Sequence, residues 1–318
     1  MFEKKSEIWR GEEAILVSGA GEIDLYDTFE CGQAFRYELT ERSDGYLEYM
    51  TVAGGKVIRV GQRKRGELLF FDMTDEEFER IAVPYFALDR DYDEIRRDVI
   101  SRTDSKWLIQ ASESAKGIVI LKQDPWEALF SFIVSQNNNI PRIKKIIRTM
   151  ALAYGDNLAI EAGLSKCPMR LIDGEPCKGK CSECGACYSF PTPEAVVREP
   201  EKMLPSRPGF RYKYLLAAAE SVYSGETDLS AIEARGSYEY TVECLTKIKG
   251  VGKKVASCAA LFGFGNLEAF PIDVWMRRAI DEYFGGELDP MGLGKYAGVA
   301  QQYIFHYIRN FDNKQKKQ

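Results

Sequence analysis

The sequence predicts an α+β protein in which a twisted antiparallel sheet comes first and an all-helical region follows. Residues up to about 115 alternate apolar and polar side chains between glycine-containing turns, as half-buried strands do. From Pro125 onward, apolar residues recur at helical spacing between loops that contain Pro and Gly. The chain has 318 residues, of which 45% are hydrophobic, so it can bury a sizeable core. We expect an N-terminal α+β domain over residues 1–115, a helical domain over residues 116–312 and a disordered tail over residues 313–318.

Each expected element follows from its local pattern. Strands are predicted over residues 14–18, 34–39, 46–58 and 67–73, with turn signals at Ser43-Asp44-Gly45 and Gly54-Gly55. Acidic segments with helical spacing follow over residues 74–81 and 91–100. The helices expected in the second part cover residues 126–135, 142–154, 193–199, 212–224, 237–247, 253–264, 274–284 and 296–309.

Net charge gives no sign of a nucleic-acid partner, because 43 basic and 48 acidic residues leave −5. Local charge does, since residues 141–148, 203–216 and 247–254 are basic and contain no acidic residue. Solvated helix faces are the alternative explanation for each stretch. Apolar runs are too short to span a membrane, and the N-terminus lacks the apolar core of a signal peptide. We therefore expect a cytoplasmic protein, associated with the nucleoid if the source is prokaryotic.

Residues 245–258, LTKIKGVGKKVASC, predict two helices joined by a tight Gly-Val-Gly turn. Gly250 and Gly252 permit the turn, and the second helix then presents unpaired N–H groups and a positive dipole end that suit a phosphate. A simple connection between helices is the alternative. Lys254 and Cys258 share one face of the second helix, and Asp273 follows at a loop-to-helix boundary.

This combination resembles the helix-hairpin-helix DNA glycosylases that carry a Gly/Pro-rich loop and a catalytic aspartate. The resemblance implies that Lys254 is the nucleophile and Asp273 its electrostatic partner. A lysine amine can attack the sugar anomeric carbon, expel the damaged base and leave an imine for elimination, with no cofactor required. The alternatives are a phosphate-contacting Lys254, an Asp273 that only caps the next helix, and a Cys258 in the core. Lys253 is expected to have no catalytic part.

Further segments resemble the 8-oxoguanine DNA glycosylase family and cover most of the chain. By that resemblance, Asn137 enters the space left by the flipped base and Arg142 contacts the orphaned cytosine. Phe210 wedges between bases, and Arg211 reads the cytosine. The simpler explanations are a capped loop at Asn137-Asn138-Asn139 and a Pro-Gly turn with a core Phe210.

The same resemblance implies a pocket for the flipped base. The carbonyl of Gly32 would accept the N7 hydrogen that 8-oxoguanine has and guanine lacks. Gln301 would bond the Watson–Crick edge, with Phe305 stacked on one face of the base and Cys258 against the other. For Phe305 alone, a core aromatic is the simpler explanation. Trp275 stands where many relatives carry a histidine, and His306, the only histidine, is given no role.

Residues 167–187 form a cysteine-rich insertion that the resemblance does not explain. The spacing of Cys177, Cys181, Cys184 and Cys187 suits a structural zinc ion or an iron–sulfur cluster.

We therefore expect a monomeric base-excision repair enzyme, a DNA glycosylase with AP lyase activity on 8-oxoguanine opposite cytosine in double-stranded DNA. An alkylated-base (3-methyladenine-type) glycosylase of the same superfamily is one alternative, although such enzymes generally lack the lysine. A non-catalytic helix-hairpin-helix DNA-binding protein is the other, which Asp273 disfavours.

Overall fold

The computed structural model describes residues 2–161, 171–172, 175–176 and 185–312. A six-stranded antiparallel sheet occupies the N-terminal part, in the strand order β1-β2-β6-β5-β4-β3. Its strands are β1 (Glu3–Trp9), β2 (Glu12–Ser18), β3 (Tyr37–Ser43), β4 (Tyr46–Ala53), β5 (Lys56–Lys64) and β6 (Glu67–Phe71). A short hairpin, β7 (Leu171–Ile172) with β8 (Glu175–Pro176), is separate from it. The predicted α+β class with its sheet first is confirmed.

Both faces of the sheet are covered, which explains the continuous apolar run in β2. Ile15 and Val17 point into the main core, whereas Ala14 and Leu16 join a smaller cluster on the opposite face with Tyr46. Neighbouring residues of a strand point to opposite faces, so a strand buried on both sides needs apolar residues at every position.

Helices begin before the sheet is complete and continue to the end of the chain. The first group consists of α1 (Leu25–Glu30), α2 (Asp75–Glu77), η1 (Phe78–Ala82), α3 (Val83–Tyr85), α4 (Tyr92–Ser101) and α5 (Lys106–Ser114). The second comprises α6 (Pro125–Ser135), α7 (Ile140–Tyr154), α8 (Leu158–Glu161), α10 (Pro193–Arg198), η2 (Pro200–Ser206), η3 (Gly209–Arg211), α11 (Tyr212–Tyr223), α12 (Leu229–Arg235), α13 (Tyr238–Thr246), α14 (Lys253–Ala259), η4 (Ala260–Phe264), α15 (Val274–Tyr283), η5 (Met291–Tyr296), α16 (Ala297–Tyr307) and η6 (Ile308–Asp312).

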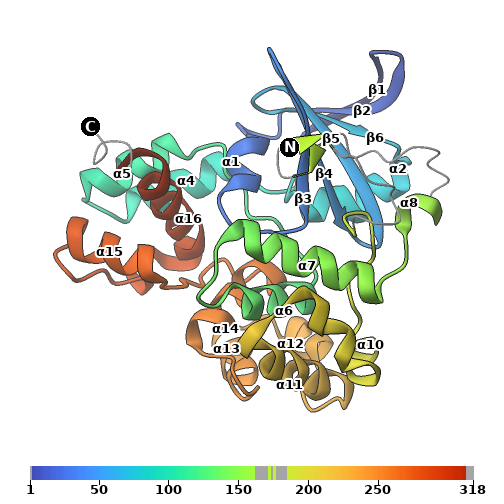
Figure 1. Ribbon diagram of the computed structural model, residues 1–318. Helices are drawn as coiled ribbons and strands as arrows, with labels where there is room; N and C mark the ends of the chain where they lie inside the picture. Colours follow the sequence, from blue (N-terminus) through green and yellow to red (C-terminus); the bar gives the residue numbers. More distant parts are fainter. Residues whose placement is uncertain (1, 162–170, 173–174, 177–184, 313–318) are drawn as a thin grey trace.

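Two helical groups flank the sheet, as Figure 1 shows. The helices α10 to α14 lie with α6 and α7 and share the main core with the inner face of the sheet. The helices α4, α5, α15 and α16 lie together at the left of Figure 1, around a second core that contains Val99, Leu108, Met276 and Ile304. Helices on either side of residue 115 thus pack together, and the domain boundary expected there stays a prediction. None of the described helices is long and apolar enough to cross a membrane.

The observed elements depart from the predicted ones in informative places. The run 46–58 is two strands, β4 and β5, separated at Gly54-Gly55, where both glycines have positive φ. The strand expected at 34–39 begins later, at Tyr37. Strand β1 was not expected because its side chains are mostly charged and exposed, as suits an edge strand. The predictions for the tail 313–318 and for Cys177, Cys181 and Cys184 lie outside the described residues.

Candidate active site

The glycine turn joins α13 to α14 and is held by two neighbours. Gly250 has φ +89, and an added Cβ would lie 2.1 Å from Cδ1 of Tyr214. The side-chain amide of Gln136 donates to the carbonyl oxygen of Gly250 over 2.9 Å. Gly252 occupies the N-cap of α14 with nothing within 4 Å of an added Cβ, so its backbone is open to a ligand. Gly250 is therefore required by close packing, and Gly252 is accessible.

Lys254 lies on the first turn of α14 and is half-buried, whereas Lys253 is exposed. The Lys254 Nζ donates to Oγ of Ser135 over 3.4 Å and lies 5.4 Å from the centre of the Phe132 ring. Both partners belong to α6, so the amine is directed toward the protein rather than into bulk water. This difference in burial favours Lys254 over Lys253 as a nucleophile.

Asp273 and Cys258 complete the group around the amine. Oδ1 of Asp273 accepts the backbone N–H of Met276 over 2.9 Å, so the carboxylate does cap α15, as its position at a loop-to-helix boundary allowed. Burial raises the pKa of the Cys258 thiol, while the charge of Lys254 acts to lower it and that of Asp273 to raise it. These two charges therefore lie near the same thiol. The Lys254 amine, the Asp273 carboxylate and the buried Cys258 thiol therefore lie in one neighbourhood.

The segment around Gly32 faces the same region from the N-terminal part of the chain. Gly32 has φ +80, and an added Cβ would lie 3.5 Å from Ile140 and 3.6 Å from the ring of Phe305. The ring of Phe35 packs against that of Phe132 at 5.5 Å, which links this segment to the neighbour of Lys254. Gly32, Phe305 and the lysine thus converge from three distant parts of the sequence.

Two further residues, Gln301 and Arg309, lie one helical turn before and after Phe305. Gln301 is buried, and its side-chain oxygen accepts from Gln302 over 2.6 Å. Arg309 donates to the carbonyl oxygen of Glu30 over 3.3 Å, and its guanidinium lies 5.5 Å from the centre of the Phe305 ring. Sequence reasoning did not single out Arg309, although its helical spacing from Phe305 places both on one face. Phe132, Ser135 and Ile140 were also missed as site residues.

The three asparagines before α7 do different things. Asn139 caps the helix by accepting from the N–H of Arg142 over 3.0 Å, and Asn138 donates to the carbonyl oxygen of Val134 over 3.1 Å. Asn137 is exposed and has φ +48, a conformation that asparagine tolerates better than most residues. The capped-loop explanation therefore accounts for two of the three and leaves the Asn137 side chain projecting from the surface.

Arg211 and Phe210 lie beside this loop but differ in exposure. Arg211 is buried and donates to the carbonyl oxygens of Gln136 over 2.8 Å and Asn137 over 3.0 Å, so here it supports the loop. Phe210 is 49% exposed, which is contrary to a core phenylalanine. Arg142 is exposed. The structure thus assembles the residues expected at the opposite base, and their contacts with DNA stay predictions.

His306 and Trp275 stand apart from this group. His306 is 5% exposed, and burial lowers its pKa to about 4, so it is neutral at physiological pH. Its ring approaches Nδ2 of Asn310 at 3.1 Å and Asp27 at 3.8 Å. Trp275 is half-buried, with the guanidinium of Arg278 5.9 Å from its ring centre.

Of the cysteines expected to bind metal, only Cys187 lies among the described residues. It is buried in a small apolar cluster with Met50, Val52 and Leu158. Within the described ranges, no group of three or more potential metal ligands occurs.

Comparisons with known proteins identify DNA glycosylases as relatives of this chain. The family described as "8-oxoguanine DNA glycosylase, N-terminal domain" matches residues 15–129. The solved structure of MBOgg1 in complex with a low-affinity DNA ligand is 34% identical, with a TM-score of 0.78 over 98% of this chain and 99% of that one. The Clostridium acetobutylicum 8-oxoguanine glycosylase/lyase, solved with dsDNA containing cytosine opposite 8-oxoG, is 30% identical, with a TM-score of 0.78 over 99% of this chain and 98% of its own. The Saccharomyces cerevisiae N-glycosylase/DNA lyase is 28% identical over 83% of this chain and 69% of its own length.

Proposed function

This chain belongs to the 8-oxoguanine DNA glycosylase family, and from that membership we propose that it excises 8-oxoguanine from duplex DNA through Lys254. It is a base-excision repair DNA glycosylase with AP lyase activity. What we propose is the role of each residue in this reaction and the lesion that the enzyme removes. The observation that carries it is the half-buried amine of Lys254 beside Ser135, near Asp273 and Cys258.

The reaction that we propose uses the Lys254 amine and the Asp273 carboxylate. The lone pair of the Lys254 amine forms a bond to the sugar anomeric carbon as the glycosidic bond breaks. The bonding electron pair leaves with the base, and a proton lost from the attacking nitrogen neutralises the departing base. Asp273 stabilises the positive charge that develops on the sugar. Because its carboxylate is already oriented by the N–H of Met276, little reorganisation is needed. The nitrogen lone pair then breaks the C1′–O4′ bond, O4′ takes up a proton, and the opened sugar is left bound to Lys254 as a protonated imine. Loss of a C2′ proton then breaks the C3′–O bond and expels the 3′ phosphate, which is the lyase step.

We assign lesion recognition to the pocket formed where Gly32 meets Phe305. The Gly32 carbonyl would accept the N7 hydrogen of 8-oxoguanine, a bond that guanine cannot make, and an unmet buried acceptor costs about 1 to 3 kcal/mol. Phe305 and Cys258 would hold the two faces of the flipped base, and Gln301 its Watson–Crick edge. The contacts of Gly32 with Phe305 and Ile140 support this assignment.

On the opposite strand, Asn137 and Phe210 would fill the gap and separate the bases, with Arg142 and Arg211 reading cytosine. The exposure of Asn137 and Phe210 supports this part. Gly250 and Gly252 would hold a phosphate of the lesion strand. Excision measured with 8-oxoguanine opposite each of the four bases tests the preference, and equal rates opposite all four would contradict it.

Borohydride trapping on an 8-oxoguanine duplex tests the nucleophile. Lys254→Gln should abolish the trapped adduct, whereas Lys253→Gln, which changes the same charge on an exposed neighbour, should retain it. A trapped adduct of wild-type yield in Lys254→Gln would overturn the assignment. The alkylated-base alternative predicts release of 3-methyladenine and no adduct, and the presence of Lys254 argues against it.

We also propose a structural metal at Cys177, Cys181, Cys184 and Cys187, from their spacing alone. Metal analysis of protein purified without chelator should find zinc or iron, and the absence of both would contradict it. The enzyme itself is proposed to act as a cytoplasmic monomer on DNA.

A further inference from the structure

A basic pocket lies between α7 and η2, apart from Lys254 and Asp273. It is a surface pocket of about 550 Å³, lined by Arg142, Lys145, Ile146, Thr149, Pro205, Ser206 and Arg207. Three of these side chains are cationic, and none is acidic. The two stretches of sequence that form it, residues 141–148 and 203–216, contain no carboxylate.

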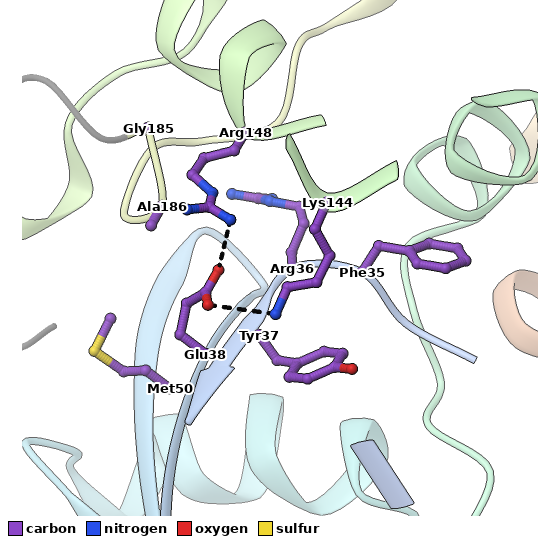
Figure 2. Close-up of a pocket in the computed structure, with 9 residues that line it drawn as sticks. All are labelled: Phe35, Arg36, Tyr37, Glu38, Met50, Lys144, Arg148, Gly185 and Ala186. Carbon is purple, nitrogen blue, oxygen red and sulfur yellow. Dashed lines mark hydrogen bonds and ion pairs between the residues drawn. The ribbon is translucent and has the colours of Figure 1, made fainter. Parts of the chain in front are cut away.

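Two charges in this pocket, those of Lys145 and Arg207, differ from those elsewhere on α7 because no counter-charge pairs with them among the described residues. Lys144 and Arg148 lie on another face of the helix, and Figure 2 shows both paired with buried Glu38, each at 3.3 Å. Within the described part of the chain, Lys145 and Arg207 have no ion pair, and both are exposed. Helix α7 therefore carries one basic face that is paired with Glu38, and another, at Lys145, whose charge is available for an anion.

A chain of contacts places the pocket relative to the nucleophile. Lys254 contacts Ser135, and the carbonyl oxygens of the next two residues, Gln136 and Asn137, accept hydrogen bonds from Arg211. Burial lowers the pKa of Arg211, and the charge of Arg142 acts in the same direction. Arg142 in turn lines the pocket. The pocket is thus separated from Lys254 by the Asn137 loop, on the side where the opposite base is expected.

We propose that this pocket binds a backbone phosphate of the strand opposite the lesion, through Lys145 and Arg207. This inference rests on the proposed function for the orientation of the duplex. Phosphates of the lesion strand meet the Gly250–Gly252 turn, so a duplex with its lesion at Lys254 presents the complementary backbone beyond Asn137. Opening the base pair requires that the orphaned base not move with the lesion. A complementary strand held by its backbone at this pocket would stay in place during that step.

Binding to a duplex that contains a tetrahydrofuran abasic analogue opposite cytosine tests the pocket without any base excision. The double variant Lys145→Gln/Arg207→Gln should bind more weakly than the wild type. The slope of log K against log salt should become shallower by about 0.9 for each phosphate that the variant no longer neutralises. The control Lys5→Gln/Arg80→Gln removes the same charge from exposed positions on β1 and η1 and should leave the slope unchanged. Equal slopes for the pocket variant and the wild type would overturn the proposal.

Neutral methylphosphonate linkages, introduced singly along each strand, identify the phosphate. One or two linkages in the complementary strand should weaken binding by the wild type and have no effect on the pocket variant. Coupling confined to the lesion strand would refute the strand assignment. Lys145→Gln alone gives a second readout that leaves the backbone at Arg207 untouched, where φ is +56. A protein that shows this coupling but releases no 8-oxoguanine would contradict the proposed function and leave the pocket standing.

Discussion

Replacing Gly250 by alanine tests the idea that close packing fixes the hairpin turn. The new Cβ would lie 2.1 Å from Cδ1 and 2.2 Å from Cγ of Tyr214, far inside van der Waals contact. The clash should cost about 1 to 3 kcal/mol, as overpacked cores do. The left-handed backbone at φ +89 adds about 1 to 2 kcal/mol for a residue with a side chain. We therefore expect Gly250→Ala to lower the free energy of unfolding by about 2 to 5 kcal/mol.

Catalysis should suffer as well, because the displaced turn would pull the Gly250 carbonyl away from Gln136, which contacts Arg211 in turn. Urea denaturation followed by tryptophan fluorescence measures the stability, and single-turnover excision measures the activity. Gly252→Ala is the matched control, since its Cβ meets nothing within 4 Å and its φ of −91 suits alanine. The control should lower stability by less than about 1 kcal/mol, the cost of alanine at an N-cap, yet weaken DNA binding. A Gly250→Ala protein as stable as the control would refute the packing argument.

Combining the substitution with Tyr214→Ala separates the two costs. Removing the ring relieves the two shortest contacts but leaves the Cβ of residue 214 at 2.8 Å and the backbone strain, so the double variant should be more stable than the sum of the single changes predicts. A coupling of about 1 to 3 kcal/mol is expected, within the range for residues in contact. Coupling near zero would assign the whole effect to the backbone.

Three other predictions rest on single side chains. Phe210→Ala should slow excision without loss of stability. The control Tyr223→Ala removes an equally exposed ring (50% against 49%) and should change neither the excision rate nor the stability. Equal excision rates for the two variants would contradict the role of Phe210 as a wedge. Glu38→Gln should reduce the free energy of unfolding, measured in urea, by about 3 to 5 kcal/mol, because it removes the buried negative charge that pairs with Lys144 and Arg148; a change below about 1 kcal/mol would argue against a stabilising role for these ion pairs. His306 has a folded-state pKa of about 4, below its ordinary value of 6.5, so its contribution to stability is lost as pH falls through this window. The stability advantage of the wild type over His306→Asn should therefore shrink by up to about 3 kcal/mol between pH 7 and pH 4, and a constant difference would contradict the shift.

The sequence predicted the elements whose pattern is local. Helix α6 begins at Pro125, next to the Asp124 cap, and the Gly250–Gly252 turn lies between two helices as expected. These features depend on caps, breakers and apolar spacing within a few residues, which the sequence displays directly. Strand β1 and helices α1 and α5 escaped prediction because their patterns are short or polar, and their partners fix them.

A lysine after a glycine turn and an aspartate at a helix start are local signals, and their resemblance to the helix-hairpin-helix glycosylases selected Lys254 and Asp273. The tertiary structure added that Lys254 is more buried than Lys253, the lysine that the resemblance had already set aside, and it separated Asn137 from its two neighbours by their hydrogen bonds. It also brought Gly32 to Phe305 and placed Lys145 and Arg207 in one pocket, since contacts between distant segments depend on how the elements pack.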